Sequence, residues 1–463
     1  MLPINNGYNR IKPTYPKNVL KFLLIFFLLV PPLVFMPGSF KEQWIFTEYR
    51  ESKLAVLLIT FWLLAAWFSF FFFERYINQI KRLIRSSIFI LLSFLSLYSM
   101  MSIYWACVPE AAIYETVQWV SFTFMFLIFV CLLKSKKWLK MAIYSINCAF
   151  IIVTLIGIIQ TFKNIPFLMP ISGTKYGSTF GSKNACFLSL GSQFFLLIFI
   201  LGNFLNEKKK FYAILAGICI MLELIYVAIS LSRTAYAALT IGMASLFIFM
   251  LLIVPKDKRI FIYKSTGFSL VIFFIVMLLT QQIYPRYWNM TIHRISNQMI
   301  PFILHPSNYL NKNPRGQLIL DTCEMIKDHP FGVGAGNWLF LYPLYHNHLK
   351  KIGFNRKKQA RKVHNDYIQY LAELGFPGFL AFIGLLFLSF KKLLSCIRHK
   401  TCNFYEKTFA ACLTAQLVAV AIMLFFSFYL EFPYRKFLFV FLLSLIYTLP
   451  SHERAKIPPK PTS

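Results

Sequence analysis

The feature that most limits the fold of this chain is its set of long apolar runs. Residues 54–73 read LAVLLITFWLLAAWFSFFFF, with only two hydroxyl side chains in the whole run. About 20 such residues in a helix cross the hydrocarbon core of a bilayer. The whole chain is 58% hydrophobic, above the roughly 45–50% of soluble domains. The sequence therefore predicts an all-α polytopic membrane protein.

We expect about 12 transmembrane helices, separated by one large loop. The Pro31–Pro32 pair in the first span predicts a kink or a short break. Residues 1–281 would hold helices 1–9, 282–366 a large loop with short helices on the non-cytoplasmic side, 367–449 helices 10–12, and 450–463 a cytoplasmic tail. The expected span cores are 19–36, 53–73, 86–106, 116–133, 138–162, 184–205, 211–231, 234–254, 262–281, 367–390, 408–429 and 434–449.

Charge sets the expected orientation. The net charge of +31 would suggest nucleic acid for a soluble protein, but in a membrane protein Lys and Arg concentrate in short cytoplasmic loops. The stretch 107–115 has no basic residue and should face the other side. We therefore place both termini in the cytoplasm and expect membrane lipids, not nucleic acid, as partners. The basic loops are 74–85, 134–140, 206–210, 255–259 and 391–400.

The expected large loop is basic although it lies on the non-cytoplasmic side, where the topology rule predicts few Lys and Arg residues. Residues 282–365 contain twelve Lys or Arg against three Asp or Glu, and six of the eight histidines. Such a surplus indicates an anionic ligand; the alternative is a solvated loop with scattered charge. The nine cysteines show no metal-binding spacing, so we expect no metal site and no cofactor.

Two arginines are candidate anion ligands. A helix capped by Asn313 should run from Pro314 to about Lys327. Arg315 then lies in its first turn, where free backbone N–H groups also attract anions. Arg233 lies between two apolar runs with almost no loop, where an arginine is costly unless it faces a cavity or a partner. The alternatives are a surface arginine at 315 and an interfacial one at 233 that extends to water.

Two glycine-containing stretches are weaker candidates. GTKYGSTFGSKNACF (173–187) offers Lys183 and Asn184 for a phosphate or a sugar. HPFGVGAGNW (329–338) lacks the spacing of a nucleotide fingerprint. Its glycines, Gly334 among them, are typical of a tight turn with close backbone approach.

The stretch VHNDYIQYLAELGFPGFLAF (363–382) joins a polar segment to an apolar span. We expect His364 to begin a short helix that stops near Gly375, with Pro377 starting the next one. An imidazole can act as acid or base near neutrality, although a structural, hydrogen-bonded histidine is the alternative.

These motifs together resemble the O-antigen ligase family of Gram-negative bacteria. The family signature of His-Asn, nine residues and Gly-x-x-Gly reads here as His364-Asn365, nine residues and Gly375-Phe-Pro-Gly378. Arg233, Arg315 and the PFGVGAGNW stretch with Gly334 resemble further family elements. FGSKNA resembles the family's F-G-N-P-N stretch, with Ser182-Lys183 in place of Asn-Pro, and keeps Asn184. The resemblance covers about residues 173–385.

The resemblance implies a membrane-embedded glycosyltransferase fold in the bacterial inner membrane, with an active site facing the periplasm. The implied reaction transfers O-antigen glycan from undecaprenyl-pyrophosphate to lipid A–core, with inversion and without a metal or nucleotide. It implies catalytic roles for His364, Arg315 and Arg233, and substrate binding by Asn365, Asn184, Lys183 and Gly334.

Other functions stay open at this point. An O-antigen polymerase and a protein O-oligosaccharyltransferase share the donor chemistry. A transporter or flippase fits the expected span count, and Glu223 in MLELIYV is an intramembrane carboxyl of the kind it would use.

Overall fold

The computed structural model describes residues 14–34, 49–162, 177–180, 183–191, 193–230, 232–254, 314–345 and 362–450, with isolated positions between 278 and 289. Every regular element in these ranges is helical. Seven helices are long and apolar enough to cross a membrane, which agrees with a multi-pass membrane protein. The ninth expected span (262–281) lies almost wholly outside the described residues, as do Asn313, the 255–259 loop and the tail after residue 450.

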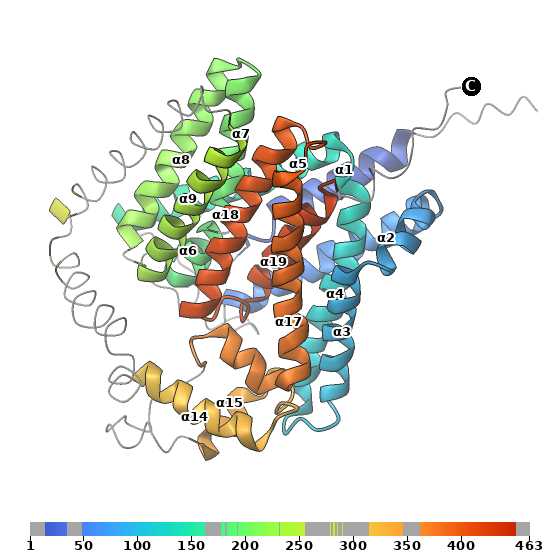
Figure 1. Ribbon diagram of the computed structural model, residues 1–463, viewed down its shortest axis with the longest axis vertical. Helices are drawn as coiled ribbons and strands as arrows, with labels where there is room; N and C mark the ends of the chain where they lie inside the picture. The colour runs from blue at the N-terminus through green and yellow to red at the C-terminus, as the bar shows by residue number, and fades with distance from the viewer. Residues whose placement is uncertain are drawn as a thin grey trace, which may run out of the picture.

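The seven long apolar helices are α2 (Tyr49–Ile84), α4 (Pro109–Leu133), α5 (Lys136–Phe162), α8 (Lys210–Ser230), α9 (Arg233–Ile253), α17 (Asp366–Arg398) and α18 (Phe404–Phe426). Shorter apolar helices accompany them: α1 (Thr14–Leu29), α3 (Ser87–Ser102), α7 (Phe194–Asn206) and α19 (Pro433–Thr448). Helices α7–α9 lie on one side of α17–α19, and α2–α4 lie on the other (Figure 1). One continuous apolar core joins these helices.

Three sequence expectations about helix bounds are corrected. The span expected at 184–205 is two helices, α6 (Lys183–Gly191) and α7, because Gly191 and the buried Gln193 interrupt the apolar run. The basic segments 74–85 and 391–400, expected as loops, continue α2 to Ile84 and α17 to Arg398. Lys and Arg are good helix formers, so a helix extends past the point where its hydropathy falls.

Helix α1 ends at Leu29, before the Pro31–Pro32 pair, where the sequence predicts a kink or a short break within the span 19–36. Residues 30–33 form a turn after α1, and carbonyl groups in and directly after this turn bind a buried lysine of α2. The Lys53 ammonium donates to the carbonyl oxygens of Pro32 at 2.6 Å and Val34 at 2.7 Å. A turn that exposes carbonyl oxygens thus satisfies a cation inside the bundle.

The two ends of the bundle carry different elements, and the orientation expected from the loop charges stays a prediction. At one end Glu207 of the α7–α8 turn binds Lys140 at 3.0 Å and Lys209 at 2.7 Å. At the other end lie α14 (Pro314–Asp328), α15 (Trp338–Leu341) and the first turns of α17 (Figure 1). The α3–α4 connection, which carries no basic residue, packs against this second end. The candidate histidine lies there too.

A small second core holds α14 on the start of α17. Leu318, Met325 and Trp338 are buried together with Ala372. The Trp338 indole donates to Thr322 Oγ1 at 3.1 Å. This packing fixes the position of the first turn of α14, which carries Arg315.

Candidate functional site

His364 lies at the entry to α17 in a backbone conformation that non-glycine residues rarely adopt. Its φ is +64°, in the left-handed region that costs an L-residue about 1–2 kcal/mol. Asn365 follows as the N-cap, and its side-chain oxygen accepts from the Ile368 N–H at 3.1 Å. The helix therefore begins at Asp366, two residues later than expected. His364 is held at the rim of the helix by the turn rather than within its first turn.

Arg315 and His364, which are 49 residues apart in the chain, are close in space. Burial, with a contribution from the Arg315 charge, lowers the pKa of His364 from its ordinary value to about 4. Both effects disfavour a second positive charge. The imidazole is therefore neutral at pH 7 and has a ring nitrogen able to accept a proton.

The connection between α18 and α19 forms the other wall of the site. The His364 ring meets the Phe428 ring edge-on, with centroids 4.8 Å apart. The Asp366 side chain accepts the backbone N–H groups of Tyr429 at 2.5 Å and Leu430 at 3.1 Å. The first residue of α17 thus fixes the connection against the histidine.

Charged side chains form a buried layer beneath this wall. Lys362 forms an ion pair with Glu431. Burial opposes the charged form of Lys362, but the carboxyl groups of Glu431 and Glu373 outweigh it and raise the pKa of Lys362. The fully buried Arg435 donates to the Phe428 carbonyl at 3.0 Å and lies over the Phe432 ring at 4.1 Å. The layer contains both signs of charge where the apolar helices end.

The glycine-rich stretch packs on the break in α17. Val333 N donates to Ala372 O at 2.9 Å, and Gly334 N donates to Glu373 O at 3.0 Å. Gly375 has φ +60° and interrupts the helical dihedrals, as expected. A Cβ on Gly375 would lie 2.3 Å from the Phe331 carbonyl carbon. The glycines therefore serve the close backbone approach that the sequence predicts.

The same stretch binds the α3–α4 connection. Trp105 Nε1 donates to Gly332 O at 3.1 Å. The Asn337 side chain accepts from Val108 N at 2.8 Å and donates to Val108 O at 3.1 Å. These contacts join the first turns of α17, the glycine stretch and the α3–α4 connection into one platform, and His364 directly precedes the α17 part of it.

The other predicted site residues lie at different distances from this platform. Arg233 begins α9, directly after the α8–α9 turn that the Tyr236 hydroxyl closes by donating to Ala228 O at 2.7 Å. Gly334 is in the platform, where its N–H donates to the Glu373 carbonyl oxygen. Lys183 and Asn184 begin α6, but their side chains lie outside the described part of the chain. The substrate contacts assigned to all four residues stay predictions.

Sequence reasoning missed the α18–α19 connection. Phe428, Glu431 and Arg435 lie in or beside it, and Lys362 precedes the histidine by two residues. A signal was present, since Glu431, Arg435 and Lys436 interrupt two apolar runs. In the described ranges no group of three or more His, Cys, Asp or Glu could hold a metal ion.

The fold and the site indicate a class of protein: a multi-pass helical membrane protein with a histidine–arginine site where its apolar helices end. Residues 217–383 match the model of a family described as O-antigen ligase. This match supports membership of the O-antigen ligase family and confirms the resemblance predicted from the motifs. It includes Arg233, Arg315 and His364, but neither Asn184 nor the α18–α19 connection. No curated protein matches the chain.

Proposed function

We propose that this protein transfers O-antigen glycan from undecaprenyl-pyrophosphate to lipid A–core at the periplasmic face of the inner membrane. The observation that carries the proposal is the position of His364, held in a turn at the entry to a long apolar helix and packed on Phe428, where the Arg315 charge acts on it. A lipid-linked donor holds its reacting pyrophosphate at the headgroup level, so polar catalytic groups have to begin where the hydrocarbon ends.

In the proposed reaction an acceptor hydroxyl attacks the anomeric carbon of the donor glycan. The new bond joins the acceptor oxygen to this carbon, and the bond to the pyrophosphate oxygen breaks. The acceptor proton passes to the neutral ring nitrogen of His364. Direct attack from the opposite face inverts the anomeric centre.

The two arginines act on the leaving group in this mechanism. Guanidinium geometry matches phosphate oxygens, and fixed cations stabilise the charge that develops as undecaprenyl-pyrophosphate departs. Arg315 would bind the pyrophosphate near His364, and Arg233 would bind it from the start of α9. This leaves no step that requires a metal ion or a nucleotide.

The test compares lipopolysaccharide from a deletion strain complemented with wild type, His364→Ala or His329→Ala. His329 lies on the same side of the protein, against the Tyr345 ring, and serves as the matched control. Membrane levels of all three proteins are measured first. We expect wild type and His329→Ala, but not His364→Ala, to restore the O-antigen ladder, with lipid-linked glycan accumulating in the inactive strain.

The acceptor is decided by the product of the deletion strain. Lipid A–core without any repeat supports a ligase. Core carrying a single repeat would instead identify an O-antigen polymerase. An unchanged ladder would refute both and direct attention to a glycoprotein acceptor.

A further inference from the structure

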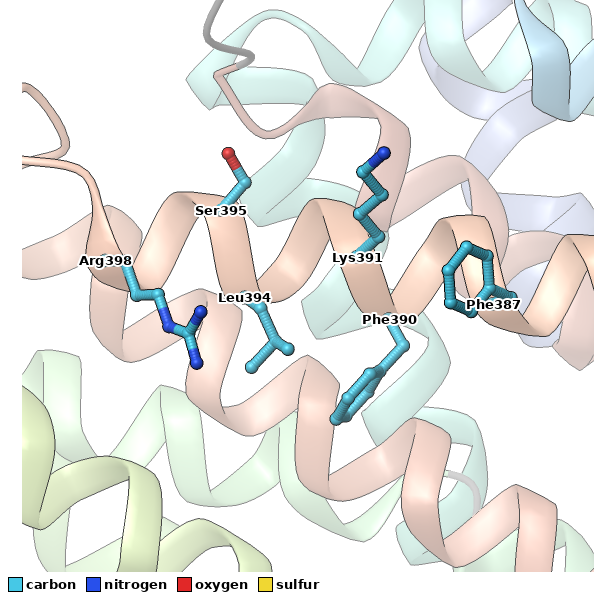
Figure 2. Close-up of a pocket in the computed structure, with 6 residues that line it drawn as sticks. All are labelled: Phe387, Phe390, Lys391, Leu394, Ser395 and Arg398. Atoms are coloured by element: carbon cyan, nitrogen blue, oxygen red, sulfur yellow. The ribbon is translucent and has the colours of Figure 1, made fainter.

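A groove runs along the last turns of α17, at the end of the bundle opposite His364. Its volume is about 500 Å³, and it is lined by Phe387, Phe390, Lys391, Leu394, Ser395 and Arg398. Figure 2 shows these six side chains projecting from one helix, with Lys391 and Ser395 on one flank and Phe390, Leu394 and Arg398 on the other. The reaction proposed above uses none of them.

The apolar part of the groove faces the surroundings of the bundle. The Phe387 side chain is 64% exposed, and Phe390 and Leu394 are partly exposed. These residues belong to a helix long and apolar enough to cross a membrane. An exposed aromatic and aliphatic face at this position fits an acyl chain.

The polar residues of the groove alternate with the apolar ones along the helix, since Lys391 follows Phe390 and Ser395 follows Leu394. Lys391 and Arg398 are seven residues apart, so their Cα atoms lie on nearly the same face, about 10 Å apart along the axis. Their side chains extend to opposite flanks of the helix (Figure 2), and both line the groove. The Ser395 side chain lies between them in height and can donate a hydrogen bond. Two cations and a hydroxyl beside an apolar face match a phosphodiester joined to a hydrocarbon chain.

Among the residues that the structure describes, no carboxylate forms an ion pair with Lys391 or Arg398. The nearby Glu406 carboxylate accepts the Asn403 backbone N–H at 3.0 Å as part of a capping box. The end of α17 carries a partial negative charge of about half an elementary charge, which two full positive charges exceed. Lys392, by contrast, donates to the Tyr447 carbonyl at 2.7 Å, so it is used in packing.

We propose that this groove binds one anionic phospholipid of the bilayer, with the phosphate at Lys391, Ser395 and Arg398 and an acyl chain on Phe387, Phe390 and Leu394. A bound lipid would hold the α17 end of the bundle at the headgroup level. The site is separate from the proposed glycan transfer and does not depend on it.

The experiment titrates the full-length protein in mild detergent with phosphatidylglycerol or phosphatidylcholine and counts retained lipids by native mass spectrometry. The test variant is Lys391→Gln with Arg398→Gln. The control is Lys400→Gln with Lys407→Gln, which removes the same charge from the same end of the bundle. Each basic residue near an anionic lipid surface contributes about fivefold. We therefore expect about 25-fold weaker phosphatidylglycerol retention in the test variant and no change in the control.

Further arms separate the two halves of the site. Leu394→Ala should weaken phosphatidylglycerol retention while both cations remain. Equal losses in the two charge variants, or equal retention of phosphatidylcholine by wild type, would overturn the proposal. Displacement of the lipid by millimolar inorganic phosphate would also overturn it, because the groove would then be an anion site without an acyl contribution.

Discussion

The neutral state of His364 can be measured by carbethoxylation, because diethyl pyrocarbonate reacts with the neutral imidazole only. A free histidine side chain has a pKa of about 6.5, so its neutral fraction rises from about 9% at pH 5.5 to about 91% at pH 7.5. With the pKa of His364 lowered to about 4, the neutral fraction stays at about 97% or more over the same range. The reference rate should change about tenfold, and the His364 rate hardly at all.

The assay follows the modified His364 peptide by mass spectrometry, with N-acetylhistidine in the same tube as reference. Partial burial lowers the absolute rate at His364, so the slope against pH is the informative quantity. Arg315→Gln should raise the pKa of His364 by the smaller part of the shift, since burial is the larger cause. A His364 rate that falls in parallel with the reference would refute both the lowered pKa and its origin in burial.

Two further predictions concern the platform that holds His364. Gly375→Ala should lower the thermal unfolding temperature and the yield of folded protein, because φ +60° and ψ −169° form a glycine-only region that costs about 1–3 kcal/mol; the matched Gly384→Ala, whose Cβ would meet only the end of Leu91, should be tolerated. Glu431→Gln leaves Lys362 without the carboxylate of its ion pair and should cost roughly 0.5–3 kcal/mol. Adding Lys362→Met should restore part of this loss, and a double variant less stable than either single variant would contradict the pairing.

The site could be predicted from the sequence where local chemistry decides the structure. Pro314 starts a helix that ends at Asp328, one residue past the expected end, because proline suits the first helical position. Gly375 breaks α17 because few other residues adopt its backbone angles. The closeness of Arg315 and His364 agrees with the family motifs, which place both in one site.

The parts of the fold and of the site that the sequence does not predict depend on contacts between distant segments of the chain. Gln193 is the buried N-cap of α7, and its neighbours in the chain are ordinary, so the sequence does not mark this helix boundary. Phe428 and Glu431 reach the site because Asp366, 63 residues earlier than Tyr429, binds the backbone of their connection. A hydropathy window averages over single residues and detects only the length of an apolar run. It therefore places the ends of α2 and α17 too early, because both helices continue into basic segments.

A histidine with a pKa of about 4 is a weak base, and the proposed donor offers a way to strengthen it. A bound pyrophosphate would neutralise the Arg315 charge, which is one of the two causes that lower the pKa of His364. The acid limb of kcat/KM reports the free enzyme and that of kcat the substrate complex. We therefore expect the kcat limb at a higher pH than the kcat/KM limb, measured with a lipid-linked donor and lipid A–core in detergent.

Activity should fall as the pH drops through each pKa, because the protonated imidazole cannot accept the acceptor proton. In Arg315→Lys the charge remains and the separation of the limbs should persist, whereas in Arg315→Gln it should shrink. Coincident limbs in the wild type would show that the donor does not act on His364 through Arg315.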